Sequence, residues 1–143
     1  QLCGLGAHVV VSGPSQTRTE RAAASVRAGS TGPGRATALP LDLVDFAGVR
    51  DFAAAVHEAL PGGLHLLLLN AGTQYWGYLG MADPGRAMRL PGEAFVAPSG
   101  HDRVYAVNHL GHFLLALLLA PSWAPRLRRG RQQHPRVVGR LRA

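Results

Sequence analysis

Lysine is absent from this sequence of 143 residues, and cysteine and long apolar runs are scarce. All 15 basic residues are arginine, so no lysine is available to lower the pKa of a neighbouring acid. The single cysteine, Cys3, excludes an internal disulfide and a zinc site made of cysteines. The longest apolar run, residues 113–120, has eight residues, whereas a membrane-spanning helix needs about 20. The sequence therefore predicts no disulfide, no bound metal and no membrane span, and it favours a cytoplasmic location.

Acidic residues are absent after Pro125. Seven arginines lie in those last 18 residues, whereas residues 1–125 carry eight arginines and eight acidic residues. The formal net charge of +7 therefore belongs to the end of the chain and not to a folded face. We expect a globular domain over residues 1–120 and a disordered arginine-rich tail over residues 121–143. The alternative is a non-enzymatic interaction module whose arginine-rich tail binds acidic partners or RNA.

Short apolar runs alternate with amphipathic segments before that tail. Residues 64–69 are almost continuously apolar, which is typical of a strand buried on both faces of a parallel sheet. Thr17 and Glu20 have the spacing of a capping box, and Asp45 is predicted to cap the next helix. The expected elements are strands over residues 7–12, 36–43 and 64–69, and helices over residues 17–28, 46–60 and 102–120.

The third helix and the segment before it are less regular. Asp102 is predicted to cap this helix, which is expected to bury Leu110, Leu114 and Leu117. Residues 74–98 are rich in glycine and proline and have no sustained periodicity. We therefore expect a long loop or an insertion there.

Alternating strands and helices predict an α/β fold, a doubly wound parallel sheet with right-handed crossovers. Such sheets bind ligands at the carboxyl ends of their strands. Asp42 follows the second expected strand, and Asn70, Ala71 and Gly72 follow the third. Asn70 offers both a donor and an acceptor, and the two small residues let a ligand approach the backbone. By spacing alone, Asn-Ala-Gly is more often an ordinary turn than part of a site, and Asp42 is also consistent with a helix cap or a turn.

Four stretches carry a family signature in the order of the chain. They are residues 6–11 (Gly-Ala-His-Val-Val-Val), residues 41–43 (Leu-Asp-Leu), residues 64–72 (ending in Asn-Ala-Gly) and residues 107–114 (Val-Asn-His-Leu-Gly-His-Phe-Leu). Together they resemble the short-chain dehydrogenase/reductases, in particular the branch of retinol dehydrogenases and WW-domain oxidoreductases. The resemblance implies a partial Rossmann-type fold, whose first strand and glycine-rich loop would precede residue 1 and whose C-terminal half would follow.

The resemblance also implies a nicotinamide cofactor, NADP or NAD. Asp42, with Leu43 beside it, matches the aspartate that accepts a hydrogen bond from the adenine amino group. Pro14 stands where NADP-preferring relatives have an arginine, but Arg18 lies one helical turn further on and is expected to reach the 2′-phosphate. No acidic residue stands at that strand end to hold the ribose of NAD, so NADP is favoured.

Two further roles follow from the same resemblance. Asn70, Ala71 and Gly72 match the turn that lies against the ribose and nicotinamide half of the cofactor. Asn108 matches the catalytic asparagine, which in relatives holds a water in a proton relay.

The proton donor of the family is missing from these residues. It is a tyrosine followed four residues later by a lysine, and this sequence has no lysine. We therefore expect a fragment, splice form or frame-shifted product of an oxidoreductase that transfers a hydride between NAD(P)(H) and a small-molecule carbonyl or alcohol. By itself the chain is expected to be inactive.

Overall fold

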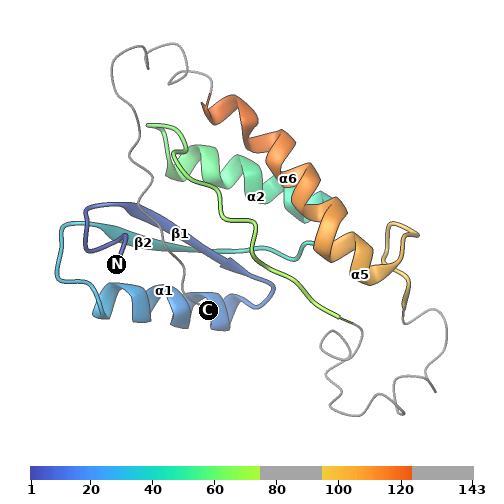
Figure 1. Cartoon of the computed structure of the whole chain (residues 1–143), viewed down its shortest axis with the longest axis horizontal. Helices are drawn as coiled ribbons and strands as arrows, with labels where there is room; N and C mark the ends of the chain where they lie inside the picture. Colours follow the sequence, from blue (N-terminus) through green and yellow to red (C-terminus); the bar gives the residue numbers. More distant parts are fainter. Residues whose placement is uncertain (75–94, 124–143) are drawn as a thin grey trace.

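A computed structural model of the chain describes residues 1–74 and 95–123 (Figure 1). Strand β1 (His8–Gly13) pairs in parallel with β2 (Arg35–Pro40), with His8 opposite Arg35. Helix α1 (Gln16–Ala28) contacts both strands on one side of this sheet. On the other side lie α2 (Phe46–Ala59) and a long helical segment after residue 102. The predicted parallel α/β arrangement is confirmed for this part of the chain.

The first two helices begin at capping side chains. Ser15, with an extended backbone, caps α1 because its Oγ accepts a hydrogen bond from the Arg18 amide at 3.4 Å. The capping box predicted at Thr17 is therefore wrong: the chain has already turned at Gly13 and Pro14, which leaves Ser15 as the last extended residue. Asp45 caps α2, as predicted, because its Oδ1 accepts from the Ala47 amide at 3.1 Å.

The long helical segment has three parts before its final 3₁₀ turn (Ala120–Trp123). They are α5 (Arg103–Tyr105), the π-helical turn η2 (Ala106–Gly111) and α6 (His112–Leu119). Asp102 caps it as predicted, with its Oδ1 accepting from the Tyr105 amide at 2.8 Å. The predicted buried face is confirmed only in part, since Leu114 packs against the core but the fully buried residues are Leu115 and Leu119, whereas Leu117 is 56% exposed. A π turn inserts an extra residue, and each extra residue rotates the rest of a helix by about 100°.

Residues Arg103–Ser122 form one helix of 20 residues that is long and apolar enough to cross a membrane by length and composition. This finding differs from the expectation of no membrane span, which rested on an apolar run of eight residues. About a third of its apolar window is buried inside the structure, where α6 packs against α2.

The main hydrophobic core lies between α2, α6 and the turn after β2. Its buried members from these elements include Phe52, Val56, Leu115, Leu119 and Leu43. Burial of such side chains stabilises a fold by about 1.5–3 kcal/mol each. The core thereby holds the helices against the carboxyl end of β2.

Residues 64–69 follow an extended course (Figure 1) but do not form the strand predicted from their sequence. Leu64 and Leu67 pack against the core, whereas Leu66 is 55% and Leu68 is 70% exposed. The prediction fails because a strand requires a hydrogen-bonded neighbour, and the only sheet among the described residues contains β1 and β2. An apolar run indicates that a segment prefers to be buried. It does not show that a neighbouring strand is present to pair with that segment.

Two expectations fall mostly on residues that lie outside the described ones. Residues 75–94 contain most of the loop or insertion expected over residues 74–98. Residues 124–143 contain nearly all of the arginine-rich tail, so its binding to acidic partners or RNA stays a prediction.

Candidate functional site

The carboxyl ends of β1, β2 and residues 64–72 lie on the same side of the molecule (Figure 1). The two strands run in parallel and end in register. A cavity of about 760 Å³ is lined by Ser12 at the end of β1, by Leu43 after β2, by Ala71 and by His112. The structure therefore brings three segment ends and the long helix to one edge, where doubly wound sheets bind ligands.

Asp42 and Leu43 form the turn between β2 and α2. Asp42 is exposed, and its Oδ1 accepts a hydrogen bond from the Val44 amide at 3.1 Å. Leu43 is buried in the core and also lines the cavity. A Cβ atom on Gly111 would clash with the Leu43 carbonyl oxygen and lie 2.9 Å from Leu43 Cβ. Only glycine lets the helix approach so closely, and this contact fixes the turn that presents Asp42.

Asn108 and Thr73 form a pair of hydrogen bonds that we call the Asn108–Thr73 clamp. The Thr73 amide donates to Asn108 Oδ1 at 2.8 Å, and Asn108 Nδ2 donates to the Thr73 carbonyl oxygen at 2.7 Å. Gly72 is close enough that a Cβ atom there would lie 3.7 Å from Asn108 Oδ1. The clamp thus fixes the end of the Asn70–Gly72 segment on the helix, while Asn70 and Ala71 stay exposed.

Asn108 sits inside the π-helical turn. Such turns occur mostly as single interruptions of α-helices and frequently at functional sites. His112 Nδ1 lies 3.2 Å from the Asn108 carbonyl oxygen. Because a carbonyl oxygen only accepts, Nδ1 is the donor, and His112 Nε2 is left as the second ring nitrogen beside the cavity.

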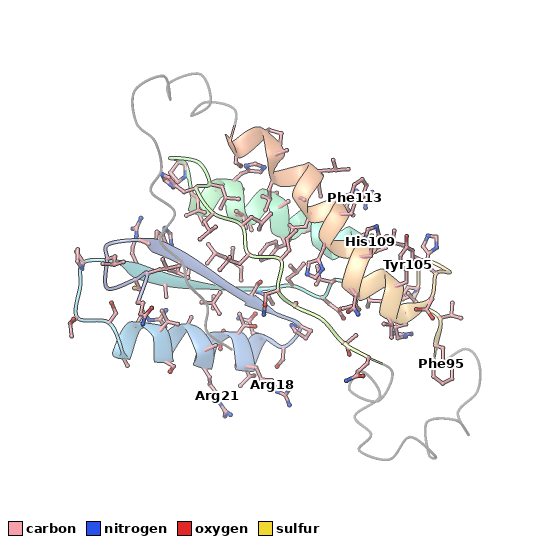
Figure 2. The ribbon with its side chains drawn as sticks, viewed as in Figure 1. Arg18, Arg21, Phe95, Tyr105, His109 and Phe113 are labelled. Carbon is pink, nitrogen blue, oxygen red and sulfur yellow. The ribbon has the colours of Figure 1, made fainter. Side chains whose placement is uncertain are left out.

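Three rings stack along another side of the same helix (Figure 2). The centroids of Tyr105 and His109 are 5.2 Å apart, and those of His109 and Phe113 are 6.3 Å apart. None of the three lines the cavity. Tyr105 therefore does not take part in the arrangement around Asn108.

Arg18 is not brought to this cavity. It lies in the first turn of α1, and its side chain and that of Arg21 project outward from the helix (Figure 2). Its position five residues after β1 keeps it near the end of that strand, but on the opposite side of the sheet from α2 and α6. A contact between Arg18 and a 2′-phosphate stays a prediction.

His8 has a clearly perturbed pKa. Burial, and then the positive charge of Arg35, lower the pKa of His8 below its ordinary value of 6.5. Its Nε2 shares a hydrogen bond with Thr37 Oγ1 at 2.7 Å. Across residues 1–74 and 95–123, no group of three or more His, Cys, Asp or Glu side chains could hold a metal ion.

Sequence reasoning missed Thr73 and His112 as parts of the site. Thr73 lies 35 positions from Asn108, and no local pattern links the two residues. Gly111 did carry a signal, because a glycine inside a helix costs about 1 kcal/mol relative to alanine and indicates a close approach.

Comparisons with known proteins agree with this geometry. The family model described as short chain dehydrogenase matches residues 1–132. Mouse polyprenol dehydrogenase is 40% identical over 139 residues, which are 97% of this chain and 36% of that protein. The zebrafish WW domain-containing oxidoreductase is 32% identical over 114 residues, which are 80% of this chain and 23% of that protein. The chain thus spans about a third or less of the length of these relatives.

A solved structure shows the same fold. A metagenomic short-chain oxidoreductase in complex with NADP superposes with a TM-score of 0.62 at 25% identity. The superposition covers 87% of this chain and 48% of that one.

Proposed function

We propose a function from the premise that this chain belongs to the short-chain dehydrogenase family. The chain is part of an oxidoreductase that transfers a hydride between a nicotinamide cofactor and an alcohol or carbonyl compound. The chain covers only 36% of the length of mouse polyprenol dehydrogenase. We therefore assign the activity to a longer protein that contains this domain. We expect the chain alone to bind nucleotide without turnover, because it has no lysine for a Tyr-x-x-x-Lys proton donor.

The exposed residues at the strand ends suit a nicotinamide dinucleotide. Asp42 keeps one carboxylate oxygen, Oδ2, without a hydrogen bond from the described residues, so it can accept from the adenine amino group. Asn70, Ala71 and Gly72 are exposed and two of them are small, so the ribose and nicotinamide half can approach their backbone. When bound, the cofactor supplies the site that gives or takes the hydride.

The Asn108–Thr73 clamp is the observation that carries this proposal. It joins the Asn70–Gly72 segment to the helix that carries Asn108, which matches the catalytic asparagine of the family. Both polar groups of the Asn108 side chain are bonded to the Thr73 backbone, so we assign Asn108 a positioning role first. A relay water would use the second lone pair of Asn108 Oδ1.

The cofactor preference and the substrate class are finer parts of the proposal. We propose NADP over NAD because Arg18 is the cation near the end of β1 and no carboxylate ends that strand. The name of mouse polyprenol dehydrogenase suggests an alcohol attached to a large apolar group. We therefore propose a small-molecule alcohol or carbonyl of that class as the substrate of the longer protein.

Titration of the full chain with NADPH and NADH, followed by the fluorescence of the reduced nicotinamide, tests the proposal. Asp42→Ala and Asn108→Ala are expected to weaken binding of both nucleotides about tenfold, a loss of about 1.4 kcal/mol each. Arg18→Ala is expected to weaken only NADPH. Asp51→Ala, at an exposed position of α2, is the matched control and is expected to leave both affinities unchanged. Equal affinities of the Asp42 and Asn108 variants and the parent chain would contradict this site.

A further inference from the structure

Ser122 and His57 form a hydrogen-bonded pair at the opposite end of the long helical segment from Asn108 (Figure 1). Ser122 lies in the final 3₁₀ turn (Ala120–Trp123), and His57 lies in the last turn of α2. Ser122 Oγ is 2.7 Å from His57 Nδ1, and His57 Nε2 is 3.3 Å from the Leu118 carbonyl oxygen. Two residues that are 65 positions apart in the sequence are therefore joined where the ends of α2 and α6 meet.

The bond to Leu118 determines which nitrogen of His57 carries the proton. A carbonyl oxygen only accepts, so Nε2 is the donor and Nδ1 of the neutral ring has a free lone pair. The Ser122 hydroxyl therefore donates to Nδ1. A hydroxyl that donates to an imidazole, with the imidazole held in the correct tautomer by a third group, is the arrangement of an activated nucleophile.

The ends of the two helices stabilise the charge that forms on His57 when it takes the hydroxyl proton. The last turn of a helix carries partial negative charge on its carbonyl groups. His57 lies in the last turn of α2 and contacts the Leu118 carbonyl oxygen in the last turn of α6. These groups occupy the place that a carboxylate has beside the histidine of a serine hydrolase.

The Ser122–His57 pair is open to reactants from solvent. His57 is exposed and Ser122 is half-buried. Leu118 and Leu60, which lies one helical turn after His57, are partly buried against the core and flank the pair with apolar side chains. We propose that Ser122 is a nucleophile that takes a short, uncharged acyl group from an activated carboxylic ester, with His57 as its base. This inference is independent of the proposed nucleotide site.

The acyl transfer needs no reactant besides the ester. Ser122 Oγ forms a bond to the acyl carbon, its proton passes to His57 Nδ1, and the ester C–O bond breaks. The proton then goes to the leaving oxygen, so the products are acylated Ser122 and a free alcohol or phenol. Water can remove the acyl group only by expelling the serine oxygen, a much poorer leaving group than that of an activated ester. The acyl group is therefore expected to stay on Ser122, which makes this a modification site.

A purely structural link between the two helices is the alternative role of the pair. Such a link needs only hydrogen bonds, whereas acyl transfer needs a group that takes a proton. His57→Gln separates the two roles, because the glutamine amide can donate to Leu118 and accept from Ser122 but does not act as a base.

The same chain contains two internal controls. His8 Nε2 and Thr37 Oγ1 are also 2.7 Å apart, but the second ring nitrogen of His8 has no acceptor among the described residues. Ser99 is exposed and has no histidine partner within residues 1–74 and 95–123. Neither hydroxyl therefore has an oriented base.

The test treats the full chain with p-nitrophenyl acetate at pH 7.5 and locates the acetyl groups by peptide mass spectrometry. The chain has no lysine, so side-chain amines do not compete for the reagent, and acetyl groups on histidine are lost by hydrolysis. General-base assistance contributes about 10²–10⁴ in rate. Acetylation of Ser122 is therefore expected to be at least tenfold faster than that of Ser99 or Thr37. His57→Gln is expected to slow it at least tenfold, with thermal unfolding measured alongside.

Three outcomes would overturn the proposal. The first is absence of a stable acetyl group on Ser122, and the second is acetylation of Ser122 no faster than that of Ser99. Both are measured on the unaltered chain, so they decide the matter even where the His57→Gln chain does not fold. The third is an unchanged rate in a folded His57→Gln chain, which would identify the pair as a structural link between α2 and α6.

Discussion

The contact between Gly111 and the turn after β2 gives a quantitative test of how the site is built. In Gly111→Ala, the new Cβ atom would lie 2.9 Å from Leu43 Cβ and 3.1 Å from the Leu43 carbonyl carbon. Carbon atoms pack at about 3.5–4.0 Å, so the helix has to retreat by about 1 Å from a turn whose backbone cannot rotate away. The retreat also separates Asn108 from Asp42.

The magnitude follows from two opposing terms. Overpacking of a core contact costs about 3 kcal/mol when backbone atoms are involved. Alanine returns about 1 kcal/mol through its higher helix propensity. The net loss of about 2 kcal/mol in the free energy of unfolding corresponds to a fall of about 6–8 °C in Tm for a domain of this size.

Thermal and urea unfolding followed by circular dichroism measure this loss. Gly48→Ala is the matched control, because its Cβ would lie 2.8 Å from Asp45 Oδ2, a carboxylate that can rotate. We expect its Tm to stay within about 3 °C of the parent value, corresponding to less than about 1 kcal/mol. A Gly111→Ala chain as stable as the Gly48→Ala chain would refute the close approach of the helix to Leu43.

Three further substitutions test other contacts. Asn108→Ala removes both bonds of the clamp and is expected to cost about 1–3 kcal/mol, with faster hydrogen exchange at the Thr73 amide; unchanged exchange there would contradict the clamp. His8 has a lowered pKa in the folded chain, so the unfolded chain binds more protons and the stability contributed by neutral His8 is lost as pH falls below 6.5. His8→Gln is expected to reduce the drop in urea midpoint between pH 7.5 and pH 5.5, and an unaltered drop would exclude this role. Asp45→Ala removes the cap of α2 and is expected to lower the free energy of unfolding by about 1 kcal/mol, as measured by urea unfolding, whereas no loss would show that the cap bond is not formed in solution.

Local signals in the sequence predicted the elements that depend on neighbouring residues. The β-branched run over β1 and the caps at Asp45 and Asp102 are confirmed, because side-chain shape and short hydrogen bonds decide them within a few residues. Residues 107–114 and the Asn-Ala-Gly sequence predicted membership of the short-chain dehydrogenase family, and the match of the family model confirms it. The roles of individual residues toward a cofactor stay predictions.

Long-range contacts caused the failures. The leucines of residues 64–69 express a preference for burial, but the sheet among the described residues contains only β1 and β2. The buried face of the long helix was predicted only in part, because a single π turn shifts the phase of every following residue and leaves Leu117 exposed. Its sequence does not reveal that turn, which is accommodated where Gly111 meets Leu43.

The sequence by itself determined the strand β1, the helices that begin after Asp45 and Asp102, the parallel pairing of β1 with β2, and the absence of a lysine for proton transfer. Only the tertiary structure decided that Asn108 holds Thr73 and that Gly111 lies against Leu43. The physical reason is that periodicity and capping are properties of adjacent residues. A clamp between residues 35 positions apart and the close approach of a helix to the turn after β2 depend on how the whole chain packs.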